Sequence, residues 1–129
     1  MTFSSPMINV YTADLPAALS FYGGLLGFEE TFRAPDPGSP EHVELRLDGV
    51  TVALSTAEAA ERVHGLRASP GSHAFQLVLW SDDVDAAYAE LVAAGVPGHT
   101  PPHDTGNNNR NAVLTDPDGN LVELVMKRL

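Results

Sequence analysis

The chain contains two similar stretches, VYTADLPAALSFYGGLLGF at residues 10–28 and LWSDDVDAAYAELVAAGV at residues 79–96. When Asp14 is placed on Asp83, 69 residues further along, alanine pairs and apolar residues fall at matching positions. An Asp-Gly pair recurs 70 residues apart, at Asp48 and at Asp118, each time before a run of β-forming residues. This shared order of signals indicates an internal repeat that fills most of the chain.

Each half of the repeat predicts a strand, a helix and then a group of strands. Asp14 is a suitable N-cap for the first helix, and Gly27 suits the left-handed residue that ends a helix. In the second half, Asp82 or Asp83 caps the helix and Gly95 ends it. Hairpin turns follow at the two Asp-Gly pairs.

These patterns predict an α+β fold made of two βαβββ modules within a single domain over residues 1–129. The modules cover about residues 5–56 and 72–127, and residues 57–71 connect them, with a short helix at 57–64. A module of roughly 55 residues is marginally stable alone, so the two modules should pack together or exchange across a dimer.

Composition restricts the function classes. The 129 residues include no cysteine, which excludes a disulfide scaffold, a thiolate metal site and a cysteine nucleophile. The formal net charge of -10 argues against nucleic acid and anionic membranes as partners, and it favours a neutral or cationic ligand. No apolar run has the length of a membrane span, and no signal peptide is evident, so we expect a cytoplasmic protein.

Strand side chains alternate between two faces, and one face of each predicted sheet is apolar enough to pack on the helices. The opposite face mixes aromatic, small and a few polar residues: Met7, Asn9, Tyr11, Glu44, Arg46, Thr51, Ala53, Gln76, Val78, Trp80, Leu121, Glu123 and Val125. We expect a curled sheet to enclose a small-molecule pocket on this face. A solvent-exposed face or a dimer contact are the alternatives.

The order of Asp14 to Phe28, then DDVDAA at 82–87, then TDPDGNLVEL at 115–124 resembles the vicinal oxygen chelate superfamily. That superfamily includes glyoxalase I, bleomycin-resistance and fosfomycin-resistance proteins and extradiol dioxygenases. The resemblance implies the glyoxalase/bleomycin-resistance-like fold, in which two βαβββ modules curl a mixed sheet around a cup, usually within a homodimer. A shared fold does not fix the reaction.

The resemblance also implies four metal-ligand positions, which fall at Met7, Ala53, Gln76 and Glu123. Glu123 is the one competent ligand among them, because a catalytic zinc normally needs three protein ligands and harder ions need several oxygens. We therefore expect no metal cofactor. A divalent metal would need further ligands, and the five histidines, His42, His64, His73, His99 and His103, are interpreted as lying outside such a site.

Glu123 is the candidate catalytic residue, as a general base or as an anchor for a cationic or hydroxyl group. The alternative is a carboxylate paired with Arg46 or hydrogen-bonded to Gln76. Tyr11 and Trp80 occupy matched positions, so they either stack on a planar ligand or serve as core or dimer-contact aromatics.

A polar stretch at 99–111 is predicted to be a long loop, from which Arg110 could close over an acidic group of a ligand. The predicted ligand-binding set is therefore Met7, Tyr11, Arg46, Ala53, Gln76, Trp80, Arg110 and Glu123. The function predicted from these residues is metal-free binding of a small organic molecule, as in bleomycin-resistance-like proteins. The alternatives are a metal-dependent glyoxalase or dioxygenase, and a metal-free isomerase or cyclase with Glu123 as base.

Overall fold

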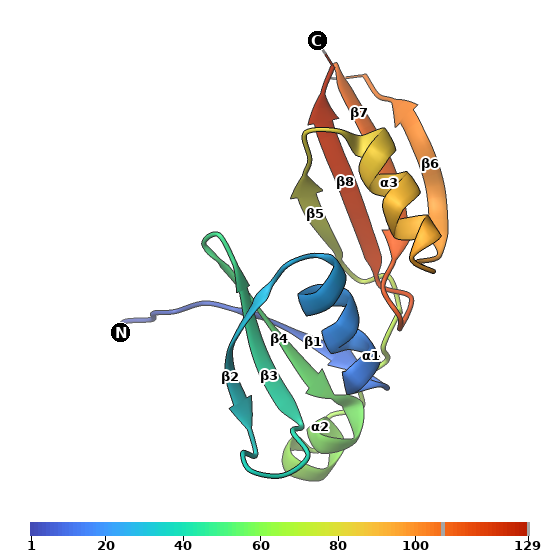
Figure 1. Ribbon diagram of the computed structural model, residues 1–129. Coiled ribbons are helices and arrows are strands. Elements are labelled where there is room, and N and C mark those ends of the chain that lie inside the picture. Colours follow the sequence, from blue (N-terminus) through green and yellow to red (C-terminus); the bar gives the residue numbers. More distant parts are fainter. Residues whose placement is uncertain (107, 129) are drawn as a thin grey trace. The chain divides into compact units, whose positions relative to one another are not determined.

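The computed structural model describes residues 1–106 and 108–128, and these residues form eight strands, three α-helices and one π-helical segment. The chain divides into two compact units, residues 1–70 and 71–129. Each unit holds one four-stranded mixed sheet with a helix on one face (Figure 1). The prediction of an α+β fold with two βαβββ modules is confirmed.

Unit 1 has the sheet order β1-β4-β3-β2, in which β1 runs parallel to β4 and the other pairs are antiparallel. Its elements are β1 (Ile8–Thr12), α1 (Leu15–Leu19), the π-helix η1 (Ser20–Leu25), β2 (Glu29–Ala34), β3 (His42–Leu47), β4 (Val50–Thr56) and α2 (Ala57–His64). The helix α2 follows β4 directly, so it lies at the end of the sheet where β4 stops (Figure 1).

The first helix begins and ends where the sequence predicts. The Asp14 carboxylate accepts a hydrogen bond from the backbone N–H of Ala17 at 3.1 Å, and Gly27 has a φ of 85°. The helix is not α-helical throughout, because residues 20–25 form a π-helix. Two glycines in this segment lower its α-helical preference, while the neighbouring Phe21 and Tyr22 are both buried and hold it on the core.

The core of unit 1 lies between these helices and one face of the sheet. Alternation predicts apolar residues on this face of each strand, and those in the middle of the strands are buried: Val10, Val43, Leu45, Val52 and Leu54. The same alternation places Ile8, Leu47 and Val50 on this face. Ile8 and Val50 are instead 56% and 53% exposed, because each begins its strand, and Leu47 is half-buried at the end of β3. The opposite face is thereby left for the polar and small residues of β1, β3 and β4.

Unit 2 repeats the topology with the order β5-β8-β7-β6, in which β5 runs parallel to β8. Its elements are β5 (Gln76–Trp80), α3 (Val84–Ala93), β6 (Gly98–Asp104), β7 (Asn109–Thr115) and β8 (Leu121–Lys127). Asp83 caps α3 through the N–H of Ala86 at 3.0 Å, and Gly95 has a φ of 96°. Both residues therefore act as the sequence predicts.

The predicted long loop at 99–111 is wrong, because most of that stretch belongs to β6 and β7. Pro101 and Pro102 argue against a strand in this stretch of sequence, since proline cannot donate a hydrogen bond to a neighbouring strand. They are tolerated because β6 is an edge strand, and its register against β7 shifts between Thr100 and His103. Asn107 lies outside the described residues.

The turn between β7 and β8 is built around Asp116, whose side chain is 1% exposed. Its carboxylate accepts hydrogen bonds from the backbone N–H of Asp118, and from the backbone and side-chain N–H groups of Asn120, at 2.8–2.9 Å. The Asn120 side chain in turn accepts from the N–H of Gly71 at 3.1 Å. Asp116 and Asn120 therefore serve the fold of unit 2.

Among the described residues, no helix is both long enough and apolar enough to cross a membrane.

Candidate functional site

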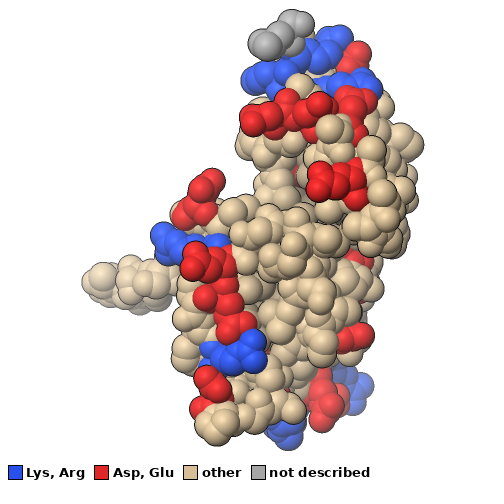
Figure 2. Space-filling model, in the orientation of Figure 1, with Lys and Arg blue, Asp and Glu red and all other residues tan. Residues whose placement is uncertain are grey.

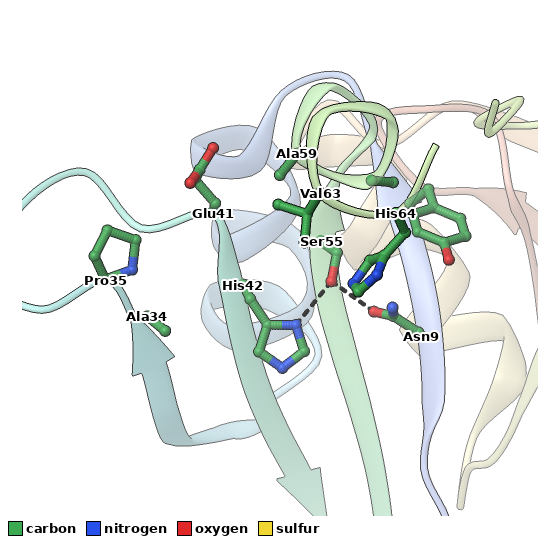
Figure 3. A pocket seen from close by; sticks show the side chains of 11 residues that line it. Asn9, Ala34, Pro35, Glu41, His42, Ser55, Ala59, Val63 and His64 are labelled. Carbon is green, nitrogen blue, oxygen red and sulfur yellow. Dashed lines mark hydrogen bonds between the residues drawn. The ribbon is translucent and has the colours of Figure 1, made fainter. Parts of the chain in front are cut away.

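A pocket of about 440 Å³ opens on the sheet face of unit 1 that is opposite α1. It lies between β1, β3 and β4, the end of β2 and the helix α2 (Figure 3). Its lining residues are Asn9, Tyr11, Ala34, Pro35, Glu41, His42, Ser55, Ala59, Ala60, Val63 and His64. Small and apolar side chains from α2 and β2 form one side, and polar side chains from the sheet form the floor.

Four polar side chains on this face form one continuous hydrogen-bonded chain, called the relay below. The Nδ1 of His42 lies 2.8 Å from the Oγ of Ser55, and Ser55 donates to the Oδ1 of Asn9 at 2.7 Å (Figure 3). The Nε2 of His42 lies 2.9 Å from a carboxylate oxygen of Glu44. The relay therefore links a carboxylate, an imidazole, a hydroxyl and an amide beside an open pocket.

The strand register explains why these residues meet. His42 pairs directly with Ser55 across β3 and β4, and Glu44 follows two residues later on the same face. Asn9 pairs with Ala53, which pairs on its other side with Glu44. Ala53 has no exposed area, so its methyl group lies beneath the longer polar side chains around it.

The sequence could have revealed the relay. The apolar alternation of the sequence predicts a strand at 43–47, whereas β3 begins at His42, so the prediction leaves His42 outside the strand. Strand parity places residue 42 on the same face as Glu44, and Ser55 on the same face as Ala53. The missing signal was therefore the start of β3.

The charged groups at the pocket rim are partly paired with each other. Arg62 of α2 donates to both carboxylate oxygens of Glu41, at 2.6 and 2.7 Å. This hydrogen bond raises the pKa of Arg62. The pair is largely solvent-exposed, so it adds little to the free energy of unfolding. The other carboxylate near the pocket, that of Glu44, is paired with the imidazole of His42 instead of with an arginine.

The four predicted ligand-binding residues in unit 1 share the face of the pocket but differ in their access to it. Tyr11 lines the pocket. Met7 and Arg46 are exposed at the other end of this face and lie outside the lining, and Ala53 is buried beneath the relay.

In unit 2, Gln76, Trp80 and Glu123 lie on the equivalent face. Glu123 is half-buried and pairs in register with Val78 and Val113, and within the described residues of unit 2 its carboxylate has no hydrogen-bond or ion-pair partner. Trp80 is 64% exposed, and the Nζ of Lys127 lies 5.8 Å from its ring centroid. These two residues border a shallow hollow of about 320 Å³.

Arg110 is held in an ion-pair network at one end of unit 2. Its guanidinium donates to Asp85 at 2.6 and 2.8 Å and to Asp104 at 2.9 Å, and Asp104 also accepts from Arg128. These hydrogen bonds raise the pKa of Arg110 and lower that of Asp85. Figure 2 shows basic and acidic side chains together at this end. Contact between Arg110 and a ligand would require one of these pairs to open.

The residues at the four metal positions that the resemblance implies do not fit a divalent cation. Unit 1 supplies a thioether from Met7 and a methyl group from Ala53, and unit 2 supplies Gln76 and Glu123. In the part of the chain that the structure describes, no three His, Asp or Glu side chains gather as a metal site. His99 and His103 instead make local hydrogen bonds, to Thr100 and to the carbonyl of Pro101.

Comparisons with known proteins agree with this architecture. A glyoxalase/bleomycin resistance protein/dioxygenase from Nocardioides is 26% identical, with a TM-score of 0.75 over 98% of this chain and 87% of that chain. A member of the glyoxalase/bleomycin resistance protein/dioxygenase superfamily from Sphaerobacter thermophilus is 29% identical, with a TM-score of 0.71 over 95% of this chain and 97% of that chain.

A glyoxalase/bleomycin resistance protein from a Streptomyces species is 28% identical, with a TM-score of 0.64 over 95% of this chain and 100% of that chain. No curated protein matches the sequence. The sequence model of one family matches residues 5–124, nearly the whole chain. The chain therefore belongs to the Glyoxalase/Bleomycin resistance protein/Dioxygenase superfamily.

Proposed function

We propose that the protein binds a small organic molecule in the pocket of unit 1 without using a metal ion. The observation that carries this proposal is a cavity of about 440 Å³ whose mostly small and apolar walls meet one set of convergent polar groups. That combination is typical of small-molecule sites, in which apolar walls give affinity and a few polar groups fix orientation. The Met7 and Ala53 side chains support the metal-free part, since neither suits a hard or borderline cation.

The charge of the site favours a neutral or cationic ligand. Two carboxylates, Glu41 and Glu44, lie at or beside the pocket, and the whole chain carries a formal charge of -10. Tyr11 adds an aromatic surface to the lining. A planar or cyclic molecule that carries a hydrogen-bonding group would contact the Tyr11 ring and the relay together.

The proposal is tested by screening a fragment library against ¹⁵N-labelled protein in the presence of a chelator. We expect hits to shift the backbone signals of Asn9, Tyr11, His42 and Ser55. We expect Tyr11→Ala to weaken the hits, whereas Phe3→Ala, which alters an exposed side chain near the N-terminus, should leave them unchanged. Hits that shift only residues around Trp80, or that need an added metal, would overturn the proposal.

A second candidate function is proton transfer by Glu123. The half-buried carboxylate lies between two valines and has no polar partner among the described residues of unit 2, and such surroundings suit a general base. In an isomerisation, Glu123 would take a proton from one carbon of the substrate and return it to another. Glu123→Gln should then abolish turnover while keeping most of the binding, and equal losses of both would argue against this role.

We further propose that the protein is a homodimer in the cytoplasm. Support comes from unit 2, where Phe75, Val78 and Trp80 leave large apolar surfaces exposed. Sedimentation velocity would measure the oligomeric state, and a monomer at micromolar concentration would contradict this proposal.

A further inference from the structure

The hydrogen bonds of the relay can be formed in more than one arrangement of their protons. The Ser55 hydroxyl has one proton, and it lies within hydrogen-bond distance of both Asn9 and His42. The Nε2 of His42 faces the Glu44 carboxylate, which can only accept when it is ionised. The number of protons on the relay therefore determines the direction of every hydrogen bond in it.

In the structure, Ser55 donates to the Oδ1 of Asn9, so its hydroxyl proton is not available to His42. The donor and acceptor roles of the two His42 nitrogens depend on the tautomer of the ring. With the amide in this orientation, hydrogen bonds at both nitrogens need a proton on Nδ1, donated to Ser55, and another proton between Nε2 and Glu44. This arrangement holds one proton more than a neutral imidazole beside an ionised carboxylate. The side-chain nitrogen of Asn9 is turned away from Ser55 (Figure 3).

When that extra proton leaves, the hydrogen bonds must reverse. A neutral His42 that keeps its Nε2 proton on Glu44 presents a bare Nδ1, which accepts from the Ser55 hydroxyl. Ser55 then has no proton for Asn9, and an Oδ1 at 2.7 Å from its oxygen would place two acceptors in contact. A half-turn of the amide removes this repulsion, because the Asn9 nitrogen then donates to Ser55.

We propose that the proton on His42 sets the orientation of the Asn9 amide, and with it the hydrogen-bonding character of this end of the pocket. Asn9 is exposed and lines the pocket, so the end of its amide that faces away from Ser55 is open to a ligand. With His42 protonated, the open end is a donor and suits a ligand acceptor such as a ketone. With His42 neutral, the open end is an acceptor and suits a ligand N–H or O–H.

Other groups around His42 do not replace this coupling. The Phe32 ring on β2 has no charge and lies edge-on to the imidazole, with 6.2 Å between the two ring centroids. Glu41 precedes His42 but is paired with Arg62 of α2, and His64 of α2 and Tyr11 of β1 line the same pocket. Arg46 follows on the same face of β3 and is exposed. Their charges affect when His42 takes up its proton, whereas Ser55 connects that proton to Asn9.

The inference is tested without a ligand by following the ¹⁵N signals of the His42 ring and of the Asn9 side-chain amide over about pH 5 to 8. We expect the Asn9 amide to change with the same midpoint as His42. The change should fall at least threefold in Ser55→Ala and return in Ser55→Thr, which restores a hydroxyl. An Asn9 amide that stays constant, a change that persists in Ser55→Ala, or a His42 that takes up no proton would overturn it.

Asn9→Asp, made with and without Ser55→Ala, provides a second check. An ionised carboxylate at position 9 can only accept from Ser55, so it favours the protonated arrangement through the hydroxyl as well as through its charge. The change that Asn9→Asp causes in the His42 midpoint should therefore shrink when Ser55→Ala removes the hydroxyl, and an equal change in both backgrounds would contradict the coupling.

The consequence for ligands rests on the proposed function, and it is measured with two neutral probes, indole as donor and acetophenone as acceptor. Acidification should favour acetophenone over indole by about threefold to tenfold, the value of one hydrogen bond. If the ratio of the two affinities stays constant with pH and the Asn9 amide signals do not change, the coupling is refuted but the proposed function is unaffected. A coupled amide in a protein that binds neither probe, nor any fragment, refutes the proposed function instead.

Discussion

The equivalent strand faces of the two units carry opposite chemistry. In unit 1 the buried Ala53 is surrounded by the polar side chains of Asn9, His42, Glu44 and Ser55. In unit 2 the register places Glu123 at the position of Ala53, and Val78, Asn111, Val113 and Val125 at the positions of those four residues. The repeat therefore preserves the backbone, while the polar and apolar side chains are exchanged at every one of these positions except Asn111, so each unit requires its own functional interpretation.

The largest effect that would sharpen this comparison is expected at the turns that join the last two strands of each unit. Asp116→Ala should lower the free energy of unfolding by about 3 kcal/mol, because three donors lose a buried acceptor. Asp48→Asn in the short turn of unit 1 should change it by less than about 0.5 kcal/mol, since asparagine also tolerates a positive φ. Urea unfolding measures both, and equal effects would show that the turns do not differ as described.

The glycines on either side of the boundary between the units should differ as well. A Cβ at Gly71, which has a φ of 77°, would collide with the carbonyl oxygen of Asp118, whereas a Cβ at Gly65, with a φ of 68°, would meet open space. We expect Gly71→Ala to cost more than about 2 kcal/mol and Gly65→Ala about 1 kcal/mol. Thermal unfolding of both variants checks the order, and the reverse order would contradict the packing of Gly71 on the turn.

Ligand affinity should depend on the polar sheet face of unit 1 and not on the equivalent face of unit 2. We expect Ser55→Ala to weaken a ligand of the unit 1 pocket by about threefold to tenfold, because one hydrogen-bonding group of the relay is lost. Asn111→Ala, at the position in unit 2 that corresponds to His42, should change affinity by less than about twofold. Isothermal titration with a fragment hit measures both, and a larger loss at Asn111 would move the site to the other face.

The smallest effect concerns surface ion pairs and pH. The Arg110 hydrogen bond lowers the pKa of Asp85 in unit 2, and the Arg33 hydrogen bond lowers that of Glu30 in unit 1. A lowered carboxyl pKa stabilises the fold above the ordinary value of about 4, and this contribution is lost as the pH falls through the folded value. Asp85→Asn should therefore flatten the acid limb of the stability profile. Glu30→Gln is the matched variant in unit 1, and the measurement is urea unfolding at a series of acid pH values. If the pH dependence of the free energy of unfolding is unchanged in both variants, these ion pairs contribute nothing to stability.

The sequence predicts the repeat, both helix caps, the helix stops and the hairpin turns, because each of these depends on a few local residues such as Asp14 and Gly95. It predicts the start of β6, as a short strand at 97–100, but not the rest of that strand, because proline signals a loop until a strand is known to lie at a sheet edge, and that is a property of the tertiary structure. It predicts the face that carries the pocket and includes Tyr11, but it misses His42. Pairing between β3 and β4 joins residues 13 positions apart, and this long-range register is set by the assembled sheet.

The segment TDPDGN at 115–120 is part of the stretch on which the resemblance to the family rests, and in this protein its buried aspartate and asparagine fasten a turn to the first residue of unit 2. A change at either side chain would therefore loosen this turn and leave the pocket of unit 1 as it is. In this protein the motif serves assembly of the unit, so its presence says nothing about the molecule that the protein holds.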